Sequence, residues 1–218
     1  MKRRSRSQRA LRRRPPRLTP RETVLIVCEG AKTEPGYFNS LWRDLRVRTV
    51  KVEIVGRGAT PITVVDEAVK KKHENNRLAN RMEAHRYDRV WCVFDVEIPH
   101  KNVSLAQALD KAKANGIRLA VSNPCFEFWV LLHFERTARL FRDCHDVVCD
   151  VRKHVRHYKK GIDLYPSLSD KTTTAIKNAQ SVDRHHLPET RPAECNPSTG
   201  VHRLVQYLRQ MAQKSSYP

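Results

Sequence analysis

The sequence predicts a parallel α/β fold of four strands that alternate with helices, followed by a helical extension at the C-terminus. Apolar runs at 23–28, 89–94 and 117–121 are typical of strands that are covered on both faces of a sheet. Segments with the apolar spacing of helices separate the strands, and the connections are short. This β-α-β order favours a parallel sheet with right-handed crossovers.

The first strand, 23–28, is expected to end at Glu29. A helix should begin near Thr33, since Pro35 is tolerated in a first helical turn. Apolar and aromatic residues then recur at helical spacing as far as Leu45, which would dock this helix on the sheet.

The second strand, 50–55, alternates apolar and polar residues. The second helix should begin at Thr60-Pro61, because Thr is a good N-cap and Pro suits the first helical position. We expect this helix to continue to about Arg86.

The third strand, 89–94, is expected to end at Asp95. A third helix over 103–115 should stop at Gly116, since glycine readily ends helices. The fourth strand then covers 117–121.

The aromatic segment 126–134, which contains Glu127, is predicted to be a buried helix. From Arg136 onward the pattern is helical without a convincing strand, and Ser198 is the predicted cap of the last helix. The apolar face of that helix comprises Val201, Leu204, Val205 and Leu208. We therefore divide the chain into a disordered basic tail (1–21), an α/β domain (22–135) and a helical C-terminal extension (136–218).

The formal net charge of +19 indicates a polyanionic partner, of which nucleic acid is the commonest soluble kind. Ten Lys and Arg residues precede the first acidic residue, Glu22, and without them the chain still carries +9. The competing interpretation is a solvated basic surface. The tail itself, with Pro15-Pro16 and hardly any apolar residue, should be disordered.

The six cysteines are scattered, without a paired CxxC pattern. Cys28 and Cys92 lie inside strand-like runs and are expected to be buried thiols. We interpret this as intracellular cysteine usage without a disulfide framework. No apolar run is long enough for a membrane span, and no secretory signal follows the basic N-terminus, so we expect a cytoplasmic protein.

Carboxylates stand at the ends of two predicted strands: Glu29 after the first, then Asp95 and Glu97 after the third. Ligands of open parallel sheets bind at the carboxyl ends of strands. In extended backbone, Asp95 and Glu97 would point the same way. Acids gathered there need a compensating cation, and Mg²⁺ prefers such oxygen ligands. The alternative for each acid alone is a helix cap or a solvated loop residue.

Two segments, V-L-I-V-C-E-G at 24–30 and V-W-C-V-F-D-V-E at 90–97, resemble the two motifs of the Toprim domain. More closely, the chain resembles the RloB-like family of bacterial defence proteins. The pieces that carry this resemblance are C-E-G-A-K-T-E-P-G-Y-F, the V-F-D segment, S-N-P-C-F-E-F-W-V-L-L-H-F at 122–134 and N-P-S-T-G-V-H-R-L-V at 196–205.

The resemblance implies a Toprim-like four-stranded parallel sheet with a metal-dependent activity on nucleic acid. Glu29 maps on the family's general acid/base or metal ligand, while Asp95 and Glu97 map on the D-x-D carboxylates that hold Mg²⁺ (or Mn²⁺). The chain departs from that pattern, because D-x-D is D-V-E here and the usual following His is displaced to His100. Similar proteins are often encoded beside an AAA or OLD-type ATPase, which suggests such a partner.

Three further residues are candidates near the predicted site. Lys32 could contact a phosphate at the helix start or be an ordinary exposed lysine. Glu34 could extend the acidic cluster, but acids in a first helical turn are ordinary dipole partners, and we favour that role. Glu127 could be a further metal ligand or make a structural hydrogen bond.

A zinc site from Cys144, Cys149, His154 and His157 is not expected, because positions five apart on a helix do not share a face. The basic run 152–160 is interpreted as a solvated helix face or as a nucleic-acid contact on which Tyr158 could stack. His133 is expected to be a core histidine rather than a catalyst.

We therefore expect a Mg²⁺-dependent Toprim nuclease in antiphage defence that acts on DNA or RNA, with an ATPase partner. The alternative is a noncatalytic nucleic-acid-binding or sensor module, which the D-V-E departure favours. A homo-oligomer is left open.

Overall fold

The computed structural model describes residues 22–47, 50–54, 60–96, 102–186 and 194–215. The basic tail 1–21, Glu97 and His100 lie outside the described residues. The strands are β1 (Val24–Cys28), β2 (Val50–Ile54), β3 (Arg89–Asp95), β4 (Arg118–Asn123) and β5 (Ser198–Thr199). The helices are α1 (Thr33–Asp44), α2 (Pro61–Asn80), α3 (Asn102–Ala114), α4 (Glu127–Leu131), α5 (Cys144–His154), α6 (Tyr165–Leu168), the 3₁₀ turn η1 (Ser169–Lys171), α7 (Thr172–Asp183) and α8 (Val201–Ser215).

The strands form one sheet in the order β2-β1-β3-β4-β5. The first four are parallel, as predicted, and β5 pairs antiparallel with β4. The chain passes from β1 to β2 on one side and returns to β3 on the other side of β1. This reversal makes the carboxyl ends of β1 and β3 a topological switch point, where ligands of open α/β sheets bind.

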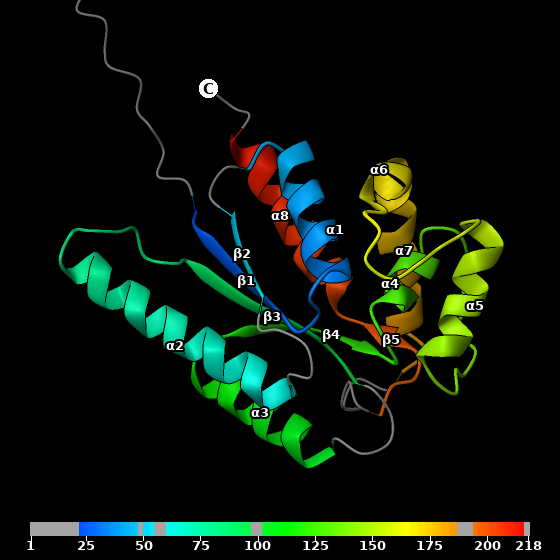
Figure 1. Ribbon diagram of the computed structural model, residues 1–218, viewed down its shortest axis with the longest axis horizontal. Coiled ribbons are helices and arrows are strands. Elements are labelled where there is room, and N and C mark those ends of the chain that lie inside the picture. Colours follow the sequence, from blue (N-terminus) through cyan, green and yellow to red (C-terminus); the bar gives the residue numbers. More distant parts are fainter. Residues whose placement is uncertain (1–21, 48–49, 55–59, 97–101, 187–193, 216–218) are drawn as a thin grey trace, which may run out of the picture.

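Helices cover both faces of the sheet (Figure 1). On one face, α2 and α3 pack with side chains such as Leu25, Val27 and Phe94 in a core of their own. On the other face, α1 and α8 share a larger core with α4 to α7, built around Ile26, Phe38 and other side chains. Strands covered in this way need apolar residues on both faces, which explains their continuous apolar runs.

The second helix is shorter than predicted, because α2 ends at Asn80 rather than near Arg86. The chain reverses after it, with Met82 at a positive φ of 62°. The amide of Asn75 holds the returning segment, since its Nδ2 donates to the carbonyl of His85 and its Oδ1 accepts from the N–H of Tyr87. Thr60 is the N-cap as expected and accepts from the N–H of Thr63.

The prediction of a C-terminal segment without a strand is wrong at Ser198–Thr199. These two residues form β5, and the Thr199 hydroxyl lies 3.0 Å from that of Ser122 on β4. The start of the last helix also differs, since α8 begins at Val201, whose N–H donates to Thr199 Oγ1. The predicted apolar face of α8 is confirmed, because its four members are fully buried.

Gly200 joins β5 to α8 at a close approach to β4. Its N–H donates to the Val121 carbonyl at 2.7 Å. A Cβ at this position would lie 3.2 Å from the Cα of Ala120 and 3.3 Å from the Val121 nitrogen. Glycine at this position therefore lets the C-terminal helix begin directly against the sheet.

Candidate metal centre

The site begins at the switch point, where Glu29 follows β1 and Asp95 ends β3. The two strands hold Glu29 directly, because its N–H donates to the Val93 carbonyl at 2.9 Å. The Glu29 carboxylate in turn accepts from the N–H of Asp95 at 3.0 Å. The two residues predicted from the strand ends are therefore adjacent in space.

One carboxyl oxygen of Asp95 is shielded from solvent. The residue as a whole is half-buried, but its Oδ1 atom is shielded from solvent, and no hydrogen-bond partner reaches that atom from the described residues. Burial raises the pKa of the Asp95 carboxyl well above its usual range, and the carboxylates of Glu34, Glu127 and Glu29 raise it further, whereas a hydrogen bond from the Phe126 backbone opposes the increase. A covered oxygen without a donor, amid other acids, suits a cation.

Glu34 lies in the first turn of α1 and is buried with this group of acids. Burial raises the pKa of Glu34 to about 7, the carboxylates of Glu127 and Glu29 add to the increase, and Lys160 opposes it. Gly30 makes room for Glu34, because a Cβ at position 30 would overlap the Glu34 carboxyl group. Glu34 is thus part of the acidic group, beyond the helix-dipole role that we favoured from the sequence.

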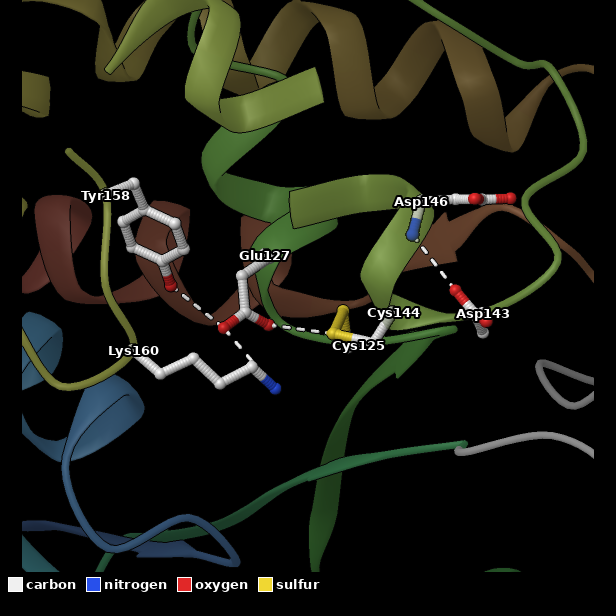
Figure 2. The surroundings of a disulfide bond; sticks show 7 residues. All are labelled: Cys125, Glu127, Asp143, Cys144, Asp146, Tyr158 and Lys160. Carbon is white, nitrogen blue, oxygen red and sulfur yellow. Dashed lines mark hydrogen bonds and ion pairs between the residues drawn. A yellow bond between two sulfur atoms is a disulfide. The ribbon is translucent and has the colours of Figure 1, made fainter. Parts of the chain in front are cut away.

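Glu127 reaches this group of acids from α4, which follows β4. The chain leaves β4 through the cis Asn123–Pro124 peptide bond and turns into α4, whose first residue is Glu127. Its side chain is only 2% exposed. The Tyr158 hydroxyl donates to Oε1 at 2.9 Å, and the Lys160 ammonium lies 3.7 Å from the same oxygen (Figure 2).

Four carboxyl groups, which we name the carboxylate cluster, therefore meet at one end of the sheet: Glu29, Glu34, Asp95 and Glu127. They come from the end of β1, from α1, from β3 and from α4. The other three acids raise the pKa of Asp95, and Glu29 and Glu127 raise the pKa of Glu34. Oxygen donors of this kind fit Mg²⁺ or Mn²⁺. The uncompensated Asp95 Oδ1 and the raised pKa values support that fit. Glu97, the remaining predicted ligand, lies outside the described residues.

The loop after α5 brings positive charge to the cluster. Gly161 has a φ of +91° and donates its N–H to Thr33 Oγ1 at 3.1 Å, at the start of α1. A Cβ on Gly161 would lie 3.0 Å from Cδ of Lys32, so the exposed Lys32 runs beside this loop. Lys32 and Lys160 consequently approach the site from neighbouring segments.

A hollow of about 340 Å³ lies beside Glu127. Its lining comprises Cys144, His145, Val148, Arg152 and Lys160. Two of these side chains are cationic and one is a histidine.

The expectation that no cysteines pair is wrong for Cys125 and Cys144, which form a disulfide. They are 19 residues apart in the chain, and the packing of α5 against α4 brings their Cα atoms to 5.5 Å. Cys28 and Cys92 are buried free thiols, as predicted. The spacing of the two cysteines in the sequence does not predict the disulfide, because the packing of α4 against α5 and the loop between them bring the two residues together.

Tyr158 is not available to stack on a base, because it is buried and bound to Glu127. Helix α5 ends at His154, so the basic run 152–160 is only partly helical. His133 is buried as expected, with Nδ1 2.9 Å from the Trp129 carbonyl, and burial lowers its pKa to about 4. His133 therefore stays neutral near pH 7.

Among the described helices, none is long and apolar enough to cross a membrane.

A family model described as RloB-like protein matches residues 24–208. The match runs from β1 into the first half of α8, and it therefore includes all four members of the carboxylate cluster together with Tyr158 and Lys160. No curated protein and no solved structure shows significant similarity to the chain. The sheet, with four parallel strands and acids after β1 and at the end of β3, is consistent with a Toprim-like fold.

Proposed function

The chain belongs to the RloB-like family, and from this and the carboxylate cluster we propose that it is a Mg²⁺- or Mn²⁺-dependent nuclease. Its reaction would be hydrolysis of phosphodiester bonds in DNA or RNA. The observation that carries the proposal is the meeting of four carboxyl groups, with a covered and unpartnered Asp95 Oδ1, at the switch point of the sheet. The net charge of +19 supports a nucleic-acid substrate.

Asp95 and Glu29 are the proposed cation ligands from the strand ends, with Glu127 as a third and Glu97 as a candidate beyond the described residues. When bound, the cation supplies charge stabilisation to the phosphate and lowers the pKa of a water nucleophile. Glu29 is held by the ends of both strands, so it can accept or return a proton from a fixed position. This is the general acid/base role expected of Glu29.

Positive side chains beside the cluster would orient the substrate. Lys160 lies 3.7 Å from Glu127, and Arg152 lines the adjoining hollow. A substrate phosphate could replace Glu127 as the ion-pair partner of Lys160. The phosphate would then be held beside the acids, which is the placement that in-line hydrolysis requires. Tyr158 would keep Glu127 in place when Lys160 binds the phosphate, because the hydrogen bond from the Tyr158 hydroxyl to Glu127 does not involve Lys160.

The test is incubation of the full-length protein with plasmid, single-stranded DNA and total tRNA in Mg²⁺, Mn²⁺ or EDTA. Metal-dependent cleavage should be lost in Glu29→Gln and Asp95→Asn. Asp110→Asn is the matched control, since Asp110 is an exposed acid on α3, on the other side of the sheet. Cleavage that persists unchanged in Asp95→Asn, with folding intact, would contradict the proposal.

A noncatalytic nucleic-acid-binding module is the second candidate. The D-V-E departure favours it, and Lys160 already offsets part of the acidic charge of the cluster. Such a module should bind nucleic acid in a salt-sensitive way without cleaving it, and the binding should be retained in Asp95→Asn.

We further propose a cytoplasmic role in antiphage defence together with an AAA or OLD-type ATPase. If cleavage is absent with the protein alone, the assay is repeated with a co-expressed AAA or OLD-type ATPase and ATP. Co-elution and ATP-dependent cleavage would support the partnership. Phage challenge of cells carrying Asp95→Asn in place of the natural chain tests the defence role.

A further inference from the structure

Two sulfur atoms lie beside the carboxylate cluster, on the side of Glu127 that faces α5. Cys125 is buried in the turn between β4 and α4. Cys144 is the half-buried first residue of α5, where Asp143 caps the helix by accepting the N–H of Asp146. Cys144 Sγ lies 3.4 Å from Glu127 Oε2 (Figure 2).

The ligand atoms of Cys125, Cys144 and Glu127 all lie within 4.8 Å of one another. In a tetrahedral zinc site with Zn–S of about 2.3 Å and Zn–O of about 2.0 Å, a sulfur and an oxygen ligand are separated by roughly 3.5 Å. The spacing between Cys144 Sγ and Glu127 Oε2 already has this value. Two thiolates and one carboxylate form a ligand set that favours a softer ion than Mg²⁺.

We propose that, once the disulfide is reduced, Cys125, Cys144 and Glu127 form a site for a thiophilic divalent cation such as Zn²⁺. Reduction by a dithiol breaks the Cys125–Cys144 bond and forms a sulfur–sulfur bond in the dithiol, whose two hydrogens pass to the cysteines. Binding of the cation then releases two protons as both thiols become thiolates. The oxidised pair has no thiolate to offer, so the site exists only in the reduced protein.

The surroundings allow a fourth ligand from solvent. Cys144 and Lys160 line the 340 Å³ hollow beside the site, so a water molecule can reach a cation held there. Glu127 would be shared, since it also belongs to the carboxylate cluster. Occupation by zinc would therefore withdraw one carboxylate from the proposed Mg²⁺ site. Zinc binding at this site would not depend on nuclease activity.

The experiment uses full-length protein reduced with a phosphine, which does not compete for the cation as a dithiol would. The phosphine gives two electrons to the disulfide and becomes its oxide, with oxygen from water, whose hydrogens pass to the sulfurs. Titration with Co²⁺ without oxygen should produce a thiolate-to-cobalt charge-transfer band and the visible bands of tetrahedral Co²⁺. Both should saturate at one ion per chain, persist in excess Mg²⁺ and disappear on addition of Zn²⁺.

Three variants make the test specific. Cys144→Ser should lose the charge-transfer band of a two-thiolate site, whereas Glu127→Gln should keep it with an affinity weaker by roughly 10-fold or more. Cys149→Ser is the matched control, because Cys149 is an exposed free cysteine on the same helix, and it should behave as wild type. Oxidised wild-type protein, which needs no substitution to fold, should give no band.

Two results would overturn the proposal. One is a reduced wild-type protein, folded by circular dichroism and with its thiols freed, that shows no charge-transfer band. The other is a charge-transfer band in Cys144→Ser that equals the wild-type band, or loss of the band in Cys149→Ser. Either result would mean that Cys125 and Cys144 act only as a covalent link between α4 and α5.

Discussion

At the scale of single residues, Glu34 and Asp95 are carboxyl groups in surroundings that favour their neutral forms. Both pKa values are raised first by burial and then by neighbouring carboxylates. Because a divalent cation binds the ionised forms, cation binding must displace protons. The cluster therefore couples the affinity for Mg²⁺ to pH.

Mg²⁺ affinity should rise with pH up to and through about 7, the pKa of Glu34. Below that pKa, the Mg²⁺ affinity should rise roughly tenfold per pH unit for each proton that is released on binding. Calorimetric titrations at several pH values, in buffers of different ionisation enthalpy, measure both the affinity and the protons released. Glu34→Gln should flatten the profile, and an affinity independent of pH would refute the coupling.

The same raised pKa makes a sign prediction for stability without cation. A carboxyl whose folded-state pKa exceeds its unfolded value binds more protons when folded between the two values. The contribution of Glu34 to the free energy of unfolding therefore falls as pH rises from about 4.5 to about 7. Urea unfolding in EDTA should show this loss, and Mg²⁺ should offset it at high pH. Glu34→Gln should reduce the loss, and the part that remains should come from Asp95, whose pKa is raised in the same sense.

Gly30 is required for the position of the Glu34 carboxyl group. Gly30→Ala should displace that group and weaken Mg²⁺ binding, because the new Cβ would take its place. Gly36→Ala is the control, since a Cβ at position 36 meets no atom within 4 Å and alanine suits the helix interior. Equal Mg²⁺ affinities in the two variants, measured by calorimetry, would show that Glu34 has no part in the site.

At the scale of elements, the segment between α5 and α6 links the C-terminal part of the chain to the carboxylate cluster. Tyr158 and Lys160 contact Glu127, and Gly161 contacts the start of α1. The Gly161 contact connects residues 128 apart in sequence, and the two contacts with Glu127 join the loop to α4. The loop therefore positions the acids without belonging to the sheet.

Tyr158→Phe should lower the free energy of unfolding by about 1.5–3 kcal/mol, the usual range for a hydrogen bond to a charged partner. It should also weaken Mg²⁺ binding by loosening Glu127. Tyr165→Phe provides the comparison, because Tyr165 donates to Asp44 away from the cluster. Tyr165→Phe should lower the free energy of unfolding and leave the Mg²⁺ affinity unchanged. If Tyr158→Phe leaves the Mg²⁺ affinity unchanged and Tyr165→Phe weakens it, Tyr158 has no positioning role.

The strands and the ends of β1 and β3 could be predicted because buried parallel strands leave long apolar runs, after which an acid is conspicuous. Glu29 and Asp95 were identified in this way. Tyr158 and the Cys125–Cys144 pair could not be, because their positions depend on how α4, α5 and the loops between them pack. The two-residue strand β5 has no periodicity to detect, and the early end of α2 depends on the hold that Asn75 exerts on the returning chain.

At the scale of the whole molecule, positive charge is distributed unevenly along the chain. The first 21 residues carry ten positive charges and no negative one. Deleting residues 1–20 should lower nucleic-acid affinity and reduce the slope of log affinity against log salt, because fewer counterions are released on binding. Fluorescence anisotropy at several salt concentrations measures the slope, and an unchanged slope would leave the tail without this role.

The contribution of Tyr158, Lys160 and α8 has a consequence for synthesis of the protein. Glu29 and Asp95 leave the ribosome before Tyr158 and Lys160, and α8, which covers β4, is made after them. A nascent or truncated chain would therefore display acids at the strand ends without the residues that orient Glu127. If the protein is a nuclease that is harmful to its own cell, this order of assembly would keep unfinished chains inactive until the loop with Tyr158 and Lys160 has been made.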